Sequence, residues 1–236
     1  YEKWPPISEA EKNLAHMEIP VIVLEFTDPD LVTEELVKLS YILSTNGEED
    51  RYLQWRSGYE KQILDFVENL APDEIPRVFL ETSFKGLNDL GTYGEGAKGS
   101  KVLELTGGSN IAGNFTEAYP HVDSEWILTE NPDVVIKYAY SSEIEWGWNS
   151  TETPEASIEE IYNRDAWESI NAVKNKRVYL VSNELMTGLD SVVGYLYWVK
   201  LLHQEFPVNP SEAYEEYVTD FLGMEYPDLI FVYPEQ

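Results

Sequence analysis

Apolar strand-like runs alternate with amphipathic helical patterns through most of this chain, and this alternation constrains the fold more than any other feature. The strand-like runs are residues 19–26, 77–82, 134–139 and 177–182. Helical patterns lie between and after them, at residues 100–106, 124–130, 157–170, 189–204 and 211–222. Such alternation predicts an α/β fold, with a mostly parallel sheet covered by helices on both faces.

The first strand-like run, residues 19–26, reads IPVIVLEF and is almost uninterrupted in its apolar character. A run of that kind is typical of a parallel strand that is buried on both faces. Thr27-Asp28-Pro29 follows directly, and this combination of a capping residue and a proline predicts the start of a helix. The sequence therefore predicts a buried strand and then a helix before residue 46.

A longer helical pattern occupies residues 48–70 and ends at Ala71-Pro72. Its apolar positions recur at steps of three and four, at Tyr52, Trp55, Tyr59, Ile63, Phe66 and Leu70. A continuous helix of this length would extend about 35 Å, enough to connect two lobes. We therefore expect residues 1–46 to belong to an N-terminal lobe, residues 47–71 to form an interdomain helix, and residues 72–236 to form a C-terminal α/β lobe.

The charge balance limits the partners of the chain. Sixteen basic residues stand against 44 acidic ones, for a formal net charge of −28. A field of that sign repels nucleic acid and anionic membrane surfaces. The chain has no cysteine, which excludes disulfides and thiolate metal sites. No apolar run reaches the roughly 18–20 residues of a membrane-spanning helix.

Ligands of open parallel sheets bind beyond the carboxyl ends of the strands, so these ends are where a site is expected. Phe84 and Lys85 follow the strand that ends at Thr82, and Tyr93 lies in the glycine-rich stretch after them. Asn183 and Met186 follow the strand that ends at Ser182. We predict that these side chains line one cleft.

A loop of nearly twenty residues follows Ala139 and carries Tyr140, Trp146 and Trp148. Loops of this length in compact domains are usually functional or disordered, and exposed indoles need something to cover them. One interpretation is an aromatic wall for a large, flat or partly apolar ligand. The alternative is that the indoles pack back against their own domain.

Signatures of catalysis are sparse in this sequence. His16, His121 and His203 are far apart, and neither H-x-x-x-H nor G-x-S-x-G occurs. Gly94, Gly96 and Gly99 match G-x-G-x-x-G, but a dinucleotide fingerprint should follow its strand directly, and here more than ten residues intervene. We therefore predict no enzyme, no cofactor and no protein-bound metal. A nucleotide-using enzyme remains an alternative, supported only by this glycine-rich stretch.

Three stretches carry a resemblance to a known family. They are residues 122–136 (VDSEWILTENPDVVI), 167–179 (WESINAVKNKRVY) and 201–206 (LLHQEF). Their order and spacing, after a long helix, resemble the helical-backbone class of periplasmic binding proteins, the iron-chelate, haem and cobalamin type. Gln204 stands where the family usually has a proline.

The resemblance implies two α/β lobes joined by one rigid helix, with the ligand in the cleft between them. The implied ligand is a metal chelate, either a ferric siderophore, a corrinoid or haem, and the implied partners are an ABC permease and its ATPase. The implied location is extracellular or periplasmic, with membrane anchoring through an N-terminal segment. Family members have more residues before the strand at 19–26, so we expect part of the N-terminal lobe to be missing.

The resemblance also implies a role for Glu125, because family members dock through a glutamate onto arginines of the permease. The alternative for Glu125 is stabilisation of a helix terminus, since it follows Ser124 in a first turn. A cell-surface interaction domain on the same fold is the alternative to transport.

Overall fold

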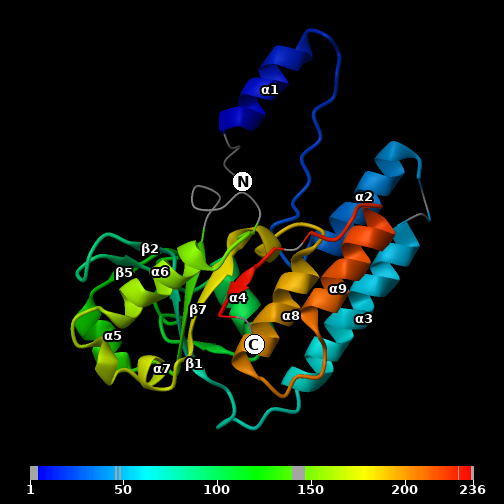
Figure 1. The fold of residues 1–236 in the computed structure, drawn as a ribbon. Coiled ribbons are helices and arrows are strands. Elements are labelled where there is room, and N and C mark those ends of the chain that lie inside the picture. The colour runs from blue at the N-terminus through cyan, green and yellow to red at the C-terminus, as the bar shows by residue number, and fades with distance from the viewer. Residues whose placement is uncertain (1–4, 46, 48, 140–146, 228, 235–236) are drawn as a thin grey trace.

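The computed structural model describes residues 5–45, 47, 49–139, 147–227 and 229–234. Its main sheet has the strand order β4-β1-β6-β7-β8 (Figure 1). The bounds are β1 Arg77–Glu81, β4 Ser109–Asn110, β6 Val134–Ala139, β7 Val178–Ser182 and β8 Val232–Tyr233. The first four strands pair in parallel, and only β8 runs antiparallel to its neighbour. The predicted α/β class and the three predicted strands in this region are confirmed.

Alternate residues of each central strand enter different apolar cores, one on each face of the sheet. In β1, for example, Val78 and Leu80 enter one core and Phe79 enters the other. All three side chains are fully buried, which explains why the strand sequences read as continuous apolar runs rather than as alternating patterns.

Helices cover both faces of the sheet, giving three layers (Figure 1). One face packs against α3 (Glu49–Val67), α4 (Lys98–Leu105), α8 (Ser191–Leu202) and α9 (Pro210–Glu216). The other face packs against α5 (Ser124–Glu130), α6 (Glu152–Tyr162), the 3-10 helix η1 (Trp167–Ser169) and α7 (Asn171–Lys174). None of the helices within the described ranges is long and apolar enough to cross a membrane.

The long helix predicted at residues 48–70 is observed as α3, Glu49–Val67, and it packs along the helical layer of the sheet-containing body. Aromatic rings join α3 to the segment after α9. The ring of Trp55 stacks on that of Tyr217, with centroids 5.6 Å apart, and Tyr52 meets the edge of Phe221 at 5.6 Å. Trp55 and Tyr59 both donate hydrogen bonds to Glu216, at 3.0 and 2.8 Å. These contacts attach α3 firmly to the C-terminal body.

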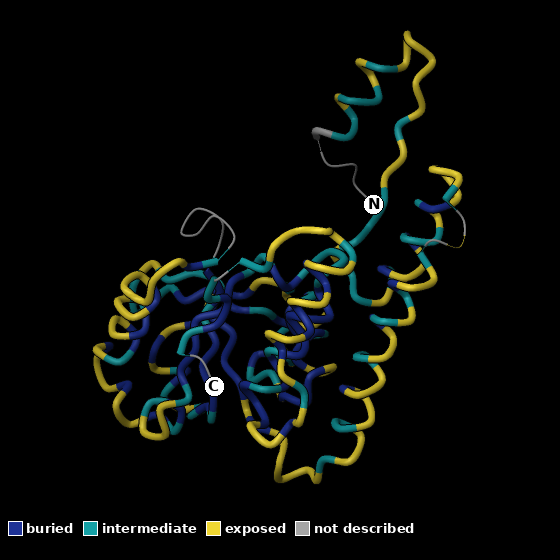
Figure 2. The backbone as a smooth tube through the Cα atoms, turned by 45° about the vertical axis from the view of Figure 1, so that its right-hand side comes forward, coloured by how far each residue is buried: buried dark blue, intermediate teal, exposed yellow. Residues whose placement is uncertain are grey.

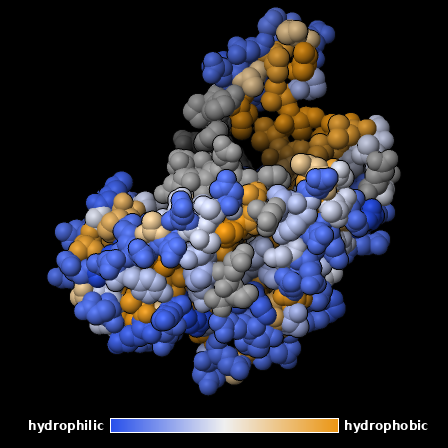
Figure 3. Space-filling view, viewed as in Figure 1, coloured by the Kyte–Doolittle hydropathy of each residue, from blue (hydrophilic) through white to orange (hydrophobic). Residues whose placement is uncertain are grey.

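The strand predicted at residues 19–26 is wrong for this structure. These residues run without secondary structure between α1 (Pro5–Ala15) and α2 (Val32–Leu43), and α1 stands away from the body (Figure 1). Ile19, Ile22 and Val23 are each about half exposed. The tube between α1 and α2 is coloured mostly as exposed or intermediate (Figure 2). A strand requires a neighbouring strand for its backbone hydrogen bonds. The described residues before α3 contain no strand. Exposed apolar side chains are visible around this segment and α2 (Figure 3).

A small antiparallel sheet follows the carboxyl end of β1. Its strands are β2 (Ser83–Phe84), β3 (Leu90–Gly91) and β5 (His121–Val122), in the order β2-β3-β5. The chain between β3 and α4 contains the glycine-rich stretch noted in the sequence. This stretch therefore lies near the ends of the parallel strands, where the site was expected.

Candidate functional site

A pocket of about 50 Å³ opens next to the carboxyl ends of β6 and β7. Four parts of the chain line it: the segment before α2, the glycine-rich stretch, α4, and the turn after β7. The lining residues are Thr27, Tyr93, Lys98, Gly99, Val102, Tyr138, Asn183, Met186 and Thr187. Its position matches the rule that parallel sheets bind ligands beyond their carboxyl ends.

The wall formed by the glycine-rich stretch depends on close packing between Tyr93 and α4. A β-carbon on Gly99 would lie only 2.5 Å from the Tyr93 ring, so this helix position requires glycine. The Tyr93 ring meets Tyr138 of β6 edge to face, with centroids 5.5 Å apart. The Tyr93 carbonyl accepts a hydrogen bond of 2.7 Å from the Asn110 side chain. The two tyrosine rings are thereby held in fixed positions.

The floor of the pocket is the 3-10 helix η2 (Asn183–Met186), whose first turn is capped by the Ser182 hydroxyl. The turn that follows is anchored to α3, because the Leu189 carbonyl accepts hydrogen bonds from Tyr52 and from Arg56. Arg56 is 1% exposed and also donates to Ser191 at 3.1 Å. The long helix thus positions the floor of the pocket.

Thr27 completes the lining, and lysines of α4 hold the segment around it, residues 25–30, in place. Lys98 contacts Glu25 at 3.2 Å and also contacts the Thr27 hydroxyl. Lys101, one turn later, contacts Asp28 at 3.3 Å and Asp30 at 2.8 Å. We call residues 25–30 the crossover segment, since they connect residues 19–24 with α2 across the edge of the pocket.

Two carboxyl groups near the pocket have shifted pKa values. Partial burial acts to raise the pKa of Glu25, but hydrogen bonds from Thr27 and the nearby Lys98 ammonium outweigh it and lower this pKa. Burial raises the pKa of Asp190, at the start of α8, to about 6, and the Glu184 carboxylate adds to that rise. Glu25 therefore remains an anion at neutral pH, whereas Asp190 titrates near the lower end of the physiological range.

The structure brings three of the predicted site residues together. Tyr93, Asn183 and Met186 come from two separate segments and line the same pocket. Phe84 and Lys85 lie elsewhere. The Phe84 ring packs against the Arg164 guanidinium at 3.9 Å, and Lys85 is exposed in the turn between β2 and β3.

The aromatic wall predicted after β6 differs from what the structure shows at Trp148. This indole is 5% exposed and lies in the core with β1, α6 and η1, and its backbone pairs with Ile230. Trp148 therefore packs back into its own domain, the alternative left open by the sequence, because burying the indole removes a large apolar surface from water. Tyr140 and Trp146 lie outside the described residues.

Several pocket residues were not identified from the sequence. Lys98 and Gly99 stand at the start of α4, Tyr138 is a β6 residue, and Thr27 belongs to the crossover segment. The signal for Lys98 and Gly99 was the glycine-rich stretch itself, which ends at the point where a helix begins. No sequence pattern marked Thr27, because its place at the pocket depends on tertiary contacts.

Glu125 is exposed in the first turn of α5. Asp123 caps this helix by accepting a hydrogen bond of 2.8 Å from the Trp126 backbone. The capping position is therefore filled by Asp123, and the Glu125 side chain faces solvent.

Acidic and basic groups at the carboxyl end of β1 pair with each other rather than with a ligand. Glu81 is fully buried and accepts two hydrogen bonds from Arg164, at 2.5 and 2.8 Å. Lys137 and Glu160 complete this group. Within the described part of the chain, no three His, Asp or Glu side chains are grouped as metal ligands. His203, for instance, is buried and its Nε2 bonds to the Gly107 carbonyl at 3.0 Å.

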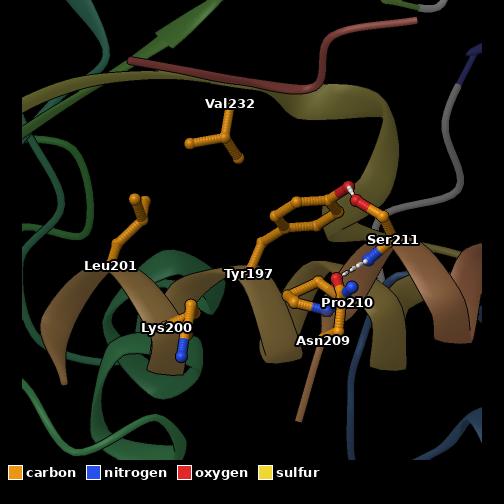
Figure 4. A pocket seen from close by; sticks show the side chains of 7 residues that line it. All are labelled: Tyr197, Lys200, Leu201, Asn209, Pro210, Ser211 and Val232. Carbon is orange, nitrogen blue, oxygen red and sulfur yellow. Dashed lines mark hydrogen bonds between the residues drawn. The ribbon is translucent and has the colours of Figure 1, made fainter. Parts of the chain in front are cut away.

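A second depression lies between α8 and the start of α9, beside β8 (Figure 4). It is lined in part by Tyr197, whose hydroxyl is 3.0 Å from that of Ser211. The one lysine that lines it, Lys200, donates to the carbonyls of Gln204 and Phe206, both at 2.7 Å. This depression lies away from the carboxyl ends of the parallel strands, so we assign the site to the first pocket.

The amino-acid sequence is similar to those of known proteins. A family model described as periplasmic binding protein matches residues 3–185. The molybdate-binding protein MolA of Haemophilus influenzae is 21% identical over 74% of this chain and 50% of its own length. The uncharacterised ABC transporter substrate-binding lipoprotein YvrC of Bacillus subtilis is 25% identical over 71% of this chain and 48% of its own length. The chain thus spans about half the length of the curated relatives it matches.

Solved structures show the same fold. The TroA-like periplasmic binding protein FepB from Veillonella parvula superposes with a TM-score of 0.79, at 19% identity, over 95% of this chain and 67% of that one. The family match covers most of the chain, and the superposition reproduces its α/β architecture. The chain therefore belongs to the periplasmic binding protein family.

Proposed function

We propose that this protein is the ligand-binding component of an ABC importer and that it binds a metal chelate against the pocket beside β6 and β7. The observation that carries the proposal is the convergence of Tyr93, Lys98 and Asn183, from three parts of the chain, at the carboxyl ends of parallel strands. The membership in the periplasmic binding protein family supports the same function.

The small volume of the pocket fits one wall of a larger cleft rather than a complete site. A cavity of about 50 Å³ holds a small polar group, whereas ligand sites for larger molecules are typically 300–1,000 Å³. We propose that residues 1–46 belong to an N-terminal lobe, that residues 47–71 link the lobes, and that the ligand lies between the lobes. Ferric siderophores, corrinoids and haem are the chelates that we propose to test.

The chemistry of the pocket supports binding rather than catalysis. Its described lining offers hydroxyls, an amide and an ammonium group for hydrogen bonding. We propose that the protein is a carrier without enzymatic activity, located outside the cytoplasm and anchored to a membrane, as the lipoprotein relative suggests.

We further propose that Glu125 contacts the permease. Its carboxylate is exposed at the start of α5, and Asp123 already provides the helix cap. Such an exposed carboxylate is suited to charge-assisted pairing with arginines of a membrane partner. The permease and its ATPase are the proposed partners.

Titration of the protein with metal-containing compounds tests the proposed function. Trp198 packs against Tyr138, a lining residue, with ring centroids 5.7 Å apart, so intrinsic tryptophan fluorescence should report a ligand in the pocket. We expect micromolar or tighter binding of at least one of ferric siderophores, cobalamin, haem and molybdate. Asn183→Trp, which fills the pocket, should weaken binding at least about tenfold.

Asn88→Trp, at an exposed turn outside the pocket lining, is the matched control and should bind as the unaltered protein does. Absence of any response to the whole ligand set would contradict the proposed function. Equal binding by the Asn183→Trp variant would move the site away from this pocket.

A further inference from the structure

Lys98 is the one charged group among the described residues that line the pocket beside β6 and β7. Its surroundings differ from the rest of the molecule, whose formal net charge is −28. The Lys98 ammonium stands among neutral hydroxyl, amide, aromatic and methionine side chains of the lining, in a protein that is strongly acidic as a whole. The place of this lysine at the pocket needs an explanation.

One explanation is mechanical, because Lys98 contacts the crossover segment through Glu25 and Thr27. However, Lys101 already holds that segment through Asp28 and Asp30, and the Gly188 backbone donates to the Phe26 carbonyl at 2.9 Å. The segment is therefore attached at two other points. Only Lys98, of the two lysines, also lines the pocket.

We infer that Lys98 makes the pocket selective for ligands that present an anionic oxygen group, and that Glu25 competes with the ligand for this lysine. The inference rests on the proposed function and specifies its ligand class. The anionic group has two possible sources, a free metal oxyanion or the acidic edge of a metal chelate, and both would be recognised by the same chemistry.

The geometry around Lys98 allows an exchange of partners. The Lys98 side chain is 43% exposed and that of Glu25 is 28% exposed, so the ammonium can be reached by a ligand from the pocket. Lysine is a flexible point charge with three donors, which lets it hold a carboxylate and a ligand in turn or together. Asn183 and the threonine hydroxyls of the lining can donate to the remaining ligand oxygens.

Because Glu25 competes with the ligand, we expect substitutions of Lys98 and of Glu25 to change the affinity for an anionic ligand in opposite directions. Lys98→Gln removes the cation and should weaken the binding of an anionic ligand about tenfold or more. Glu25→Gln removes the competing anion and should tighten the same binding about threefold or more. A purely mechanical role would make both variants weaken binding, because both break the same contact. The sign of the Glu25→Gln effect therefore separates the two explanations.

Lys101→Gln is the matched control. Lys101 lies on the same helix, has a side chain of similar exposure (39%), and contacts the same segment, but it does not line the pocket. Its replacement loosens the crossover segment but leaves the pocket cation in place, so it should weaken anion binding clearly less than Lys98→Gln does. Circular dichroism and melting curves of all three variants show whether each is folded.

Three probes complete the experiment: molybdate as a free oxyanion, ferric enterobactin as an anionic chelate, and ferrichrome as an uncharged chelate. We expect Lys98→Gln to weaken, and Glu25→Gln to tighten, the binding of molybdate or of ferric enterobactin. Binding of molybdate would identify a free oxyanion as the source of the anionic group, and binding of ferric enterobactin would identify a chelate. Binding of ferrichrome alone, or equal losses in the Lys98→Gln and Lys101→Gln variants, would overturn the inference and leave the proposed function standing. Binding of no probe and of no ligand in the wider titration would overturn both.

Discussion

At the scale of single residues, the site depends on a few side chains whose environment determines their role. Gly99 is required because the Tyr93 ring occupies the space of a β-carbon, and Lys98 matters because it alone brings charge to the described lining. Asp190 is a third case. It lies at the start of α8, behind the floor of the pocket, in surroundings that disfavour its charged form.

The raised pKa of Asp190 predicts how stability changes with pH. Burial raises this pKa from 3.8 to about 6, so between these values the folded state holds more protons than the unfolded state, and the free energy of unfolding falls as pH rises. The loss is complete above about pH 6 and amounts to about 3 kcal/mol at most. Asp190→Asn should therefore stabilise the protein by about 1–3 kcal/mol more at pH 7.5 than at pH 4.

Urea unfolding at the two pH values measures this difference. Asp73→Asn, at an exposed position, controls for the general effect of removing one carboxylate from an acidic protein. A pH dependence that is the same for Asp190→Asn and for the unaltered protein would show that Asp190 is not the group responsible.

Residue roles are also where sequence reasoning reached its limit. That Tyr93, Asn183 and Met186 line one pocket could be expected, because Asn183 and Met186 follow the parallel strand β7 and Tyr93 lies in the glycine-rich stretch beyond β1. Thr27 could not be predicted, because its position depends on contacts of the crossover segment with α4. Trp148, by contrast, was a candidate for the ligand-binding wall but does not line the pocket. Its indole is buried in the apolar core instead.

At the scale of elements, the long helix α3 determines where the floor of the pocket lies. It supports the turn after η2 through Tyr52 and Arg56, and it is attached to α9 and the following turn through aromatic rings. The sequence predicted this helix to within three residues at its carboxyl end, because the apolar spacing of three and four residues is local information. Its packing against α8 and α9 is not local and was not predicted.

Removing the Arg56 anchor should destabilise the protein. Arg56→Met removes the guanidinium hydrogen bonds to the Ser191 hydroxyl and to the Leu189 carbonyl, which keeps only its bond from Tyr52. It also removes the ion-pair partner of Glu60, whose carboxylate lies 2.8 Å away. We expect a loss of about 2–4 kcal/mol in the free energy of unfolding, measured by urea denaturation.

Lys61→Met provides the control on the same helix, since the ion pair of Lys61 with Asp65 is exposed and should contribute less than about 1 kcal/mol. Similar losses in the two variants would contradict the proposed anchoring of the pocket floor by Arg56.

The strand expected at residues 19–26 shows why elements of this kind cannot be predicted from composition alone. Its apolar sequence is typical of a buried strand, but a strand forms only beside another strand. The helices, whose backbone hydrogen bonds are internal, were predicted more reliably. For example, α5 was expected at residues 124–130 and occupies Ser124–Glu130.

At the scale of the whole molecule, a three-layer body presents one edge of its sheet, the carboxyl ends of β6 and β7, to a pocket with a single described cation. The chain shares its α/β architecture with solved structures of the periplasmic binding protein family, to which it belongs. The proposed ligand class rests on the lysine at the pocket, which the total charge of −28 does not reveal. The central claim is that the ligand binds at this edge.

The most direct test of that claim is an anomalous-difference map from crystals of the protein grown with a metal-containing ligand that it binds in solution. We expect a metal peak beside Tyr93 and Asn183, with an oxygen of the ligand within hydrogen-bonding distance of the Lys98 ammonium. A metal peak elsewhere, such as in the depression between α8 and α9, would show that the ligand does not bind at this edge of the sheet.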